Sequence, residues 1–252
     1  MGRLYDRAEI YDLMEDDTRY IWNLGHWQKL FQNKGIQTML DVSIGSGAMT
    51  LPVLDMGITL SGSDLSESML KRCREKAEKK GCYIRTVQCD FRKVSACFHE
   101  TFDCVASSGN SLAYVPNGDV VQTLHEMDRL VSPGGYLYLD TRNWDKILRE
   151  HQRFYLYNPV FRGEDRINLM QVWDYPNDGT IIFNLLYTFE RDGKIFQKEI
   201  FEERYHPIPS TLIFDAIQNM GYEDIEIYPC PAVAKERPLG ELAWYAVLAH
   251  KK

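Results

Sequence analysis

The chain has 252 residues, of which 44% are hydrophobic, and its formal net charge is −7. This hydrophobic content excludes a disordered chain, and the acidic balance argues against nucleic acid as a partner, because no basic field would attract phosphates. No apolar run approaches the roughly 18 residues of a membrane span, and the N-terminus is too polar for a signal peptide. Six cysteines without C-x-x-C spacing indicate reduced thiols. We therefore expect a cytoplasmic protein that contacts neither membrane nor nucleic acid.

Two helices are expected in residues 1–35, and a regular alternation of strands and helices follows them. Strands are predicted at 38–42, 58–64, 82–89, 102–107 and 136–140, and helices at 48–56, 66–80 and 118–130. Such β-α alternation at short spacing predicts a mostly parallel sheet with helices on both faces.

The pattern changes after residue 150. From about 165 to 206 the residues alternate without a helical period, and Asn177-Asp178-Gly179 and Asp192-Gly193 are typical hairpin turns. An antiparallel insertion is therefore expected at 150–206. A helix and two strands then complete the sheet. We predict a single domain, 1–252, with an N-terminal helical cap (1–35), a cofactor-binding core (36–149), the insertion on the substrate side and a C-terminal part (207–252).

A glycine turn follows the first predicted strand, at Gly45-Ser46-Gly47. Glycine lets the backbone approach a ligand that a Cβ would keep away. The third glycine of the dinucleotide fingerprint is missing. The second strand ends in Asp64, whose carboxylate suits ribose hydroxyls. The third ends in Asp90, followed by Phe91, a pair that suits an adenine.

These motifs, together with Phe102-Asp103 and Pro133-Gly134-Gly135, resemble in order and spacing those of class I S-adenosylmethionine-dependent methyltransferases. The resemblance implies an α/β Rossmann-like three-layer sandwich. Its mostly parallel seven-stranded sheet would end in an antiparallel last strand. It also implies S-adenosylmethionine as cofactor and S-adenosylhomocysteine as product. Ser43 stands where the family usually has glycine. The residues expected to bind the cofactor are Tyr11, Asp41, Ser43, Gly45, Gly47, Asp64, Leu65, Met69, Asp90, Phe91, Ser107 and Asn110.

Two further segments, Ser108–Pro116 and Leu139–Leu148, are similar to those of glycine and sarcosine N-methyltransferases. Thr141 replaces the usual histidine of that group and Trp144 the usual tyrosine. The resemblance implies transfer to the amine nitrogen of a small molecule, with Arg162 or Arg166 as candidates for an acceptor carboxylate. Asn143, Tyr187 and Tyr205 would be catalytic. The residues expected to bind the acceptor are Tyr20, Trp27, Asn143, Arg162, Arg166, Tyr187 and Tyr205.

Alternatives remain beside this interpretation. An enzyme that methylates adenine in nucleic acid would carry an Asn/Asp-Pro-Pro-aromatic tetrad after the fourth strand, and Ser107-Ser108-Gly109-Asn110 stands there instead. The six histidines are scattered, so no metal site is expected. A small-molecule O-methyltransferase is the next candidate, and a non-catalytic cofactor-binding protein is a third. The acceptor's identity and the choice between monomer and homo-oligomer stay open.

Overall fold

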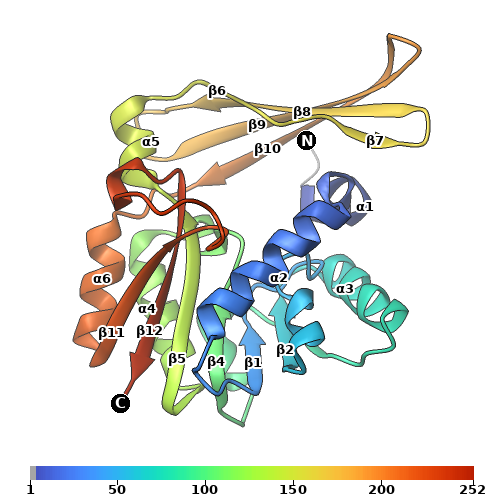
Figure 1. Ribbon diagram of the computed structural model, residues 1–252. Coiled ribbons are helices and arrows are strands. Elements are labelled where there is room, and N and C mark those ends of the chain that lie inside the picture. Colours follow the sequence, from blue (N-terminus) through green and yellow to red (C-terminus); the bar gives the residue numbers. More distant parts are fainter. Residues whose placement is uncertain (1–3) are drawn as a thin grey trace.

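The computed structural model describes residues 4–252, apart from the side chains of Asp6 and Ala8. Residues 1–3 of the predicted cap lie outside this range. Two β-sheets dominate the molecule, one above the other (Figure 1). The larger has seven strands in the order β11-β12-β5-β4-β1-β2-β3. They are β1 (Thr38–Asp41), β2 (Thr59–Asp64), β3 (Arg85–Gln88), β4 (Phe102–Ser107), β5 (Val131–Arg142), β11 (Tyr222–Pro229) and β12 (Trp244–Lys251).

Strand direction in this sheet agrees with the predicted fold class. Strands β1 to β5 pair in parallel. The last strand, β12, runs antiparallel to both of its neighbours, β5 and β11. The Rossmann-like sandwich with an antiparallel last strand is thereby confirmed.

Helices cover both faces of this sheet, and two hydrophobic clusters hold them there. Helices α4 and α6 contribute to one cluster, and α2 and α3 to the other (Figure 1). The α-helices are α1 (Ala8–Tyr11), α2 (Asp17–Phe31), α3 (Glu67–Lys79), α4 (Asn117–Asp128), α5 (Trp144–Glu150) and α6 (Ser210–Asn219). The 3-10 helices are η1 (Leu4–Asp6), η2 (Asp12–Met14), η3 (Leu51–Met56), η4 (Phe91–Ala96), η5 (Ser111–Tyr114) and η6 (Leu239–Glu241). None of the described helices combines the length and apolar character needed to cross a membrane.

The second sheet is the predicted antiparallel insertion. Its strands lie in the order β10-β9-β8-β6, with β7 also paired to β8. They are β6 (Phe154–Leu156), β7 (Val160–Arg162), β8 (Asp165–Asp174), β9 (Ile181–Arg191) and β10 (Lys194–Tyr205). Alternate residues of β8 and β9 are buried on the face toward the core. The predicted turn at Asp192-Gly193 is confirmed, with both residues at positive φ.

Three local predictions need correction. The helix expected at 48–56 is the shorter η3, because Pro52 has no N–H to donate and Val53 N donates to Thr50 O, three residues back. Strand β5 begins at Val131 instead of 136, so it includes Pro133-Gly134-Gly135. Helix α5, between β5 and the insertion, was not predicted.

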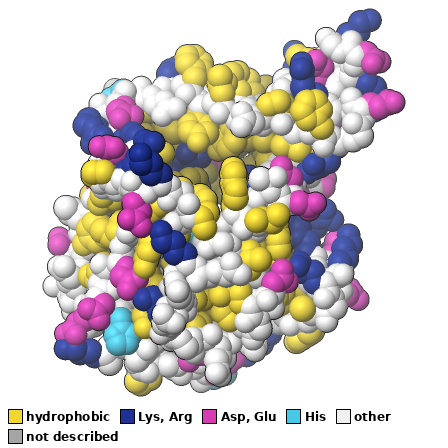
Figure 2. Space-filling model, in the orientation of Figure 1, with side chains coloured by type: hydrophobic (Ala, Val, Ile, Leu, Met, Phe, Trp, Pro, Cys, Tyr) yellow, Lys and Arg dark blue, Asp and Glu magenta, His cyan; other side chains and the backbone are white. Residues whose placement is uncertain are grey.

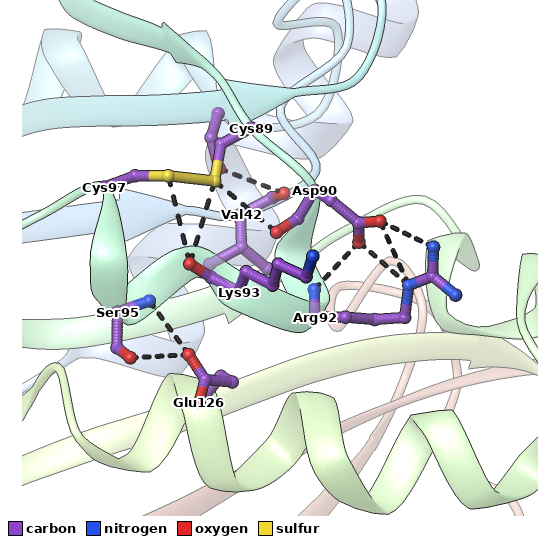
Figure 3. The surroundings of a disulfide bond; sticks show 9 residues. Val42, Cys89, Asp90, Arg92, Lys93, Ser95, Cys97 and Glu126 are labelled. Carbon is purple, nitrogen blue, oxygen red and sulfur yellow. Dashed lines mark hydrogen bonds and ion pairs between the residues drawn. A yellow bond between two sulfur atoms is a disulfide. The ribbon is translucent and has the colours of Figure 1, made fainter.

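The thiols also differ from the prediction. Cys89 and Cys97 form a disulfide that closes the loop around η4, directly after β3 (Figure 3). Four cysteines, Cys73, Cys82, Cys104 and Cys230, are free. This bridge could not be predicted, because a separation of eight residues matches no recognised cysteine motif.

Candidate active site

The glycine turn forms a tight loop at the carboxyl end of β1. Gly45 and Gly47 have φ of +54° and +78°, a region that favours glycine. A Cβ on Gly47 would stand 2.5 Å from Cγ of Leu51, so no larger residue fits there. Asp41, fully buried beneath the loop, accepts hydrogen bonds from Ser43 N at 3.0 Å and Ser108 Oγ at 2.6 Å. Burial raises the pKa of this carboxyl to about 6.

Asp64, at the end of β2, fastens the same loop from the other side. Its carboxylate accepts hydrogen bonds from Gly45 N at 3.0 Å and Ser66 N at 2.8 Å. Burial raises the pKa of Asp64, and those amides act in the opposite direction. Each oxygen keeps a further acceptor position for a ligand.

A cavity of about 50 Å³ lies between this loop, the turn after β4 and the N-terminal segment. Five predicted cofactor residues line it: Tyr11, Ser43, Gly45, Asp64 and Met69. The prediction missed the other lining residues: Tyr5, Ile44, Ser46, Ala48, Met49, Ser108, Gly109 and Ser111. Most of the missed residues adjoin motifs that the sequence did single out. Tyr5 is the exception, and only tertiary structure brings it here.

Two serines join the walls of this cavity. The hydroxyl of Ser43 lies 3.2 Å from that of Ser107 and donates to Ser108 O at 3.1 Å. The unusual serine in the loop is thus accommodated without strain, because the turn after β4 provides its hydrogen-bond partners.

Several predicted cofactor residues do not line the cavity. Asp41 and Ser107 are hydrogen-bonded to Ser43 of the lining, and Gly47 follows Ser46 of the lining in the chain. Leu65 is 60% exposed. Asn110 is buried, and its Oδ1 accepts from Thr141 Oγ1 and Arg142 N.

The predicted adenine pair also lies outside the lining. Arg92 pairs with the carboxylate of Asp90, which in addition caps η4 (Figure 3). Phe91 is buried in the larger hydrophobic cluster. A role for this pair in adenine binding stays a prediction.

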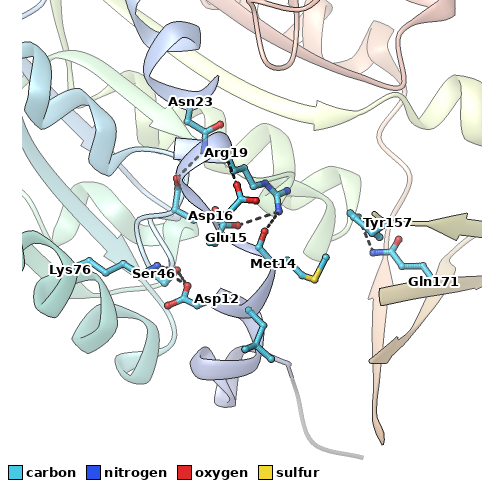
Figure 4. A network of polar contacts seen from close by, with 12 residues as sticks. Asp12, Met14, Glu15, Asp16, Arg19, Asn23, Ser46, Lys76, Tyr157 and Gln171 are labelled. Carbon is cyan, nitrogen blue, oxygen red and sulfur yellow. Dashed lines mark hydrogen bonds and ion pairs between the residues drawn. The ribbon is translucent and has the colours of Figure 1, made fainter. Parts of the chain in front are cut away.

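The N-terminal segment is fastened over the cavity by a polar network around Asp12 (Figure 4). The carboxylate of Asp12 accepts from Arg72 Nε, Lys76 Nζ and Ser46 Oγ, each at 2.7 Å. Tyr5 is tied to α3, because its carbonyl accepts from Ser66 and Ser68 at 3.0 Å. This segment therefore forms the outer wall of the cavity.

A chain of tyrosine hydroxyls leads from the cavity toward the insertion. The hydroxyl of Tyr5 lies 2.8 Å from that of Tyr114, which lies 2.6 Å from that of Tyr205. Tyr187, on the neighbouring strand, is also buried on the inner face. Burial raises the pKa of Tyr187 and Tyr205, so both stay protonated at neutral pH. The structure thus brings these two predicted residues to the side of the insertion that faces the core.

Asn143, predicted to contact the acceptor, makes hydrogen bonds that hold the fold, and its role toward the acceptor stays a prediction. Asn143 caps α5, and its Oδ1 accepts from Lys146 N. Its amide donates to the carbonyls of Leu239 and Leu242 at 2.7 and 3.0 Å. Backbone groups take both donors of the amide and one acceptor position of its oxygen, so this side chain joins α5 to the C-terminal part of the chain.

Trp27 and Tyr20 are also structural. Trp27 is fully buried in the cluster beneath α2, and its indole donates to Met49 O. The hydroxyl of Tyr20 donates to Asp55, and Lys80 lies over its ring. Neither residue lines the cavity, and their contact with an acceptor stays a prediction.

The two arginine candidates serve other contacts. Arg166 is exposed on the outer face of the insertion and pairs with Glu190. Arg162 donates to the carbonyls of Leu13 and Glu15, so it joins the tip of the insertion to the N-terminal segment. Arg166 points away from the tyrosines, whereas the strand register puts Arg162 on the same face of the insertion as Tyr187.

The sequence did not single out Arg142 or Asp140, at the end of β5. Asp140 is buried and accepts from Gly109 N at 3.1 Å and Trp244 Nε1 at 2.8 Å. Burial raises the pKa of Asp140 to about 6. The guanidinium of Arg142 lies between the two sheets, bordered by aromatic rings from both. Figure 2 shows the molecule hollowed between these sheets.

The comparisons with known proteins fit this site. Residues 39–135 match the family model described as a methyltransferase domain, which spans β1 to the first residues of β5. The fold matches a solved S-adenosylmethionine-dependent methyltransferase from Clostridium acetobutylicum, with a TM-score of 0.75 over 97% of each chain at 16% identity. This chain is an S-adenosylmethionine-dependent methyltransferase.

Two relatives that are similar to this methyltransferase are glycine/sarcosine N-methyltransferases. It is 28% identical to the glycine/sarcosine N-methyltransferase of Aphanothece halophytica, over 79% of this chain and 71% of that protein. Identity to the enzyme of the same name from Halorhodospira halochloris is also 28%, over 86% of this chain and 77% of that protein. An amino pentose methyltransferase from Micromonospora echinaspora, solved with S-adenosylmethionine bound, shares the fold at 13% identity, with a TM-score of 0.73 over 100% and 98% of the chains.

The residues of the cavity fit the cofactor of this methyltransferase. Asp64 offers free acceptor positions, and the glycine loop presents backbone rather than side chain at Gly45. When bound, S-adenosylmethionine supplies a methyl group activated by its sulfonium. A molecule of that size needs more room than 50 Å³. Tyr5 and Tyr11 are the residues of the N-terminal segment that line this cavity.

Proposed function

We propose that this methyltransferase transfers a methyl group to the amine nitrogen of a small acceptor that carries a carboxylate, as glycine and sarcosine do. The single observation that carries the proposal is the environment of Arg142. Its side chain is buried between the core sheet and the insertion, at 8% exposure. Among the side chains that the structure describes, no carboxylate forms an ion pair with it.

The guanidinium of Arg142 is held by aromatic rings and neutral polar groups instead. Its central carbon lies 4.9–5.5 Å from the ring centroids of Trp244, Phe183, Trp173 and Tyr155. Its Nη2 donates to Tyr157 Oη at 3.3 Å and is 3.5 Å from Gln171 Oε1. Ring faces favour a cation by about 0.5–2 kcal/mol each, but they do not neutralise it.

A buried cation without a counter-charge is costly, because desolvation outweighs what neutral groups return. A carboxylate from the acceptor would supply that charge and accept two parallel hydrogen bonds from the guanidinium. The names of the relatives support this class of acceptor. Arg142 takes the role first considered for Arg162 and Arg166.

The remaining residues suit methyl transfer to an amine. Methyl transfer is an in-line displacement that needs no covalent protein intermediate, so alignment and exclusion of water can supply roughly 7–11 kcal/mol. Tyr187 and Tyr205 are protonated and buried, so they can orient the amine through hydrogen bonds. The amine must react in its neutral form, and its proton can leave to solvent.

The test compares acceptors with and without a carboxylate. Glycine and sarcosine are assayed beside methylamine and dimethylamine, which lack only that group, with wild type, Arg142→Met, and Arg153→Met as control. Arg153 is exposed and pairs with Asp174. We expect Arg142→Met to lower kcat/KM for the amino acids roughly 10- to 100-fold, mainly through KM, because hydrogen bonds to charged groups contribute about 1.5–3 kcal/mol.

The midpoint of thermal unfolding separates this proposal from a purely structural role for Arg142. Under the proposal the midpoint of Arg142→Met should stay the same or rise, because Met fits among aromatic rings without a buried charge. A structural role would give a different result, a lower midpoint. Wild-type kinetics in Arg142→Met would exclude the carboxylate contact. If wild type methylates none of the four amines, the acceptor class itself is wrong.

A further inference from the structure

The outer face of the insertion sheet carries a continuous apolar row. Residues of β8 and β9 alternate along each strand, with one set buried against the core and the other accessible. On the accessible side, the strand register aligns Leu156 with Met170, Met170 with Leu186, and Leu186 with Ile200. Leu156 is 71% exposed and Ile200 46%. The row therefore crosses four strands without a polar residue.

The rows on the two sides of this apolar row end on β10 in residues of opposite charge. The next row toward the C-terminal end of β10 reads Phe154, Val172, Asn184 and Glu202. The row on the opposite side reads Asn168, Thr188 and Lys198. On β10 itself, Lys198, Ile200 and Glu202 are thus successive residues of one face. Figure 2 shows hydrophobic side chains gathered along this upper edge of the molecule.

We propose that a second copy of this chain binds here, face to face, with the two-fold axis along the apolar row. This axis places each residue of the row against its own counterpart. It also reverses the strand direction, so Lys198 of each copy meets Glu202 of the other. The interface thereby contains two Lys198–Glu202 ion pairs, one on each side of the apolar row. An isologous interface requires such a self-complementary face.

The other face-to-face axis, along the strands, is unfavourable. It would place Phe154 of one copy over Glu202 of the other and bury a carboxylate against a ring. Charge complementarity therefore selects one arrangement.

The size of the face sets the expected strength. Strand β8 pairs with β9 over residues 166–174. Five outward residues spaced about 6.8 Å apart, on four strands about 4.8 Å apart, give a face roughly 27 Å by 14 Å. That is smaller than the roughly 800 Å² per partner of a standard interface, so we expect reversible association with a Kd on the order of micromolar.

The experiment is sedimentation velocity of the full chain from about 1 µM to about 200 µM. Wild type should shift from monomer to dimer, and Ile200→Glu should remain monomeric throughout. Ile227→Glu is the matched control, because Ile227 is similarly exposed, at 43%, but lies on β11 of the other sheet. Its dimer should be unchanged.

A charge swap tests the axis with exposed residues only, so folding is not at risk. Lys198→Glu should weaken the dimer at least tenfold, and Lys198→Glu combined with Glu202→Lys should restore it. Several results would overturn the proposal. They are a wild type that stays monomeric, a dimer indifferent to Ile200→Glu (as pairing along the free edge of β10 would give), and a double swap that does not recover.

Discussion

Asp64 fixes both the shape and the charge of the cofactor side of the site. It holds the glycine loop through Gly45 N and starts α3 through Ser66 N. Asp64→Ala should weaken binding of S-adenosylmethionine more than tenfold, because it removes acceptors for the ribose hydroxyls and loosens the loop. Titration calorimetry measures this.

Asp55→Ala is the control for that measurement, because Asp55 is exposed on η3 and pairs with Lys80. Its affinity for the cofactor should equal that of wild type. Equal affinity in Asp64→Ala would instead mean that the ribose lies elsewhere.

Residue identity along the chain revealed less about the acceptor side than about the cofactor side. Asp64 and the glycines sit at strand ends, where a parallel sheet collects its ligands, so their place follows from order alone. The position of Asn143 depends on the carbonyls of Leu239 and Leu242, almost a hundred residues away. Arg142 stands out only because rings from the insertion and from β12 surround it.

At the scale of elements, the N-terminal segment determines access to the cofactor cavity. Asp12 holds this segment to α3 and to the glycine loop through Arg72, Lys76 and Ser46. Asp12→Asn removes the charge of this contact, whose hydrogen bonds are worth about 1.5–3 kcal/mol. We therefore expect the cofactor to dissociate roughly tenfold faster, as followed by stopped-flow fluorescence.

Asp17→Asn provides the comparison, because Asp17 is exposed in the first turn of α2, outside the network. Asp17→Asn should not change the rate at which the cofactor dissociates. An unchanged rate in Asp12→Asn would show that the cofactor enters by a path that this segment does not close.

Elements were predictable where a local pattern decides them, as for β4, α3 and the hairpin of β9 and β10. Ser66 caps α3, and Gly193 supplies the positive φ of the turn. The predictions were wrong where a missing backbone donor or the tertiary context determines the secondary structure. Pro52 shortened a predicted helix, and α5 is only seven residues long, too short to show a periodic pattern.

At the scale of the whole molecule, the two sheets contribute different parts of the site. The core sheet presents the glycine loop, Asp64 and Asp140 at its carboxyl edge, and the insertion covers that edge with Tyr187 and Tyr205. The inner face of the insertion meets the proposed acceptor, and its outer face is free for a second copy. One sheet, buried on one side and accessible on the other, can therefore serve catalysis and assembly without conflict.

The destination of the methyl group is the central claim, and one measurement locates it. The protein is incubated with S-adenosylmethionine labelled with carbon-13 in the methyl group and with sarcosine, and the product is examined by carbon-13 NMR. We predict an N-methyl resonance that grows in step with S-adenosylhomocysteine. An O-methyl resonance, or intact S-adenosylmethionine after prolonged incubation with sarcosine, would contradict the account.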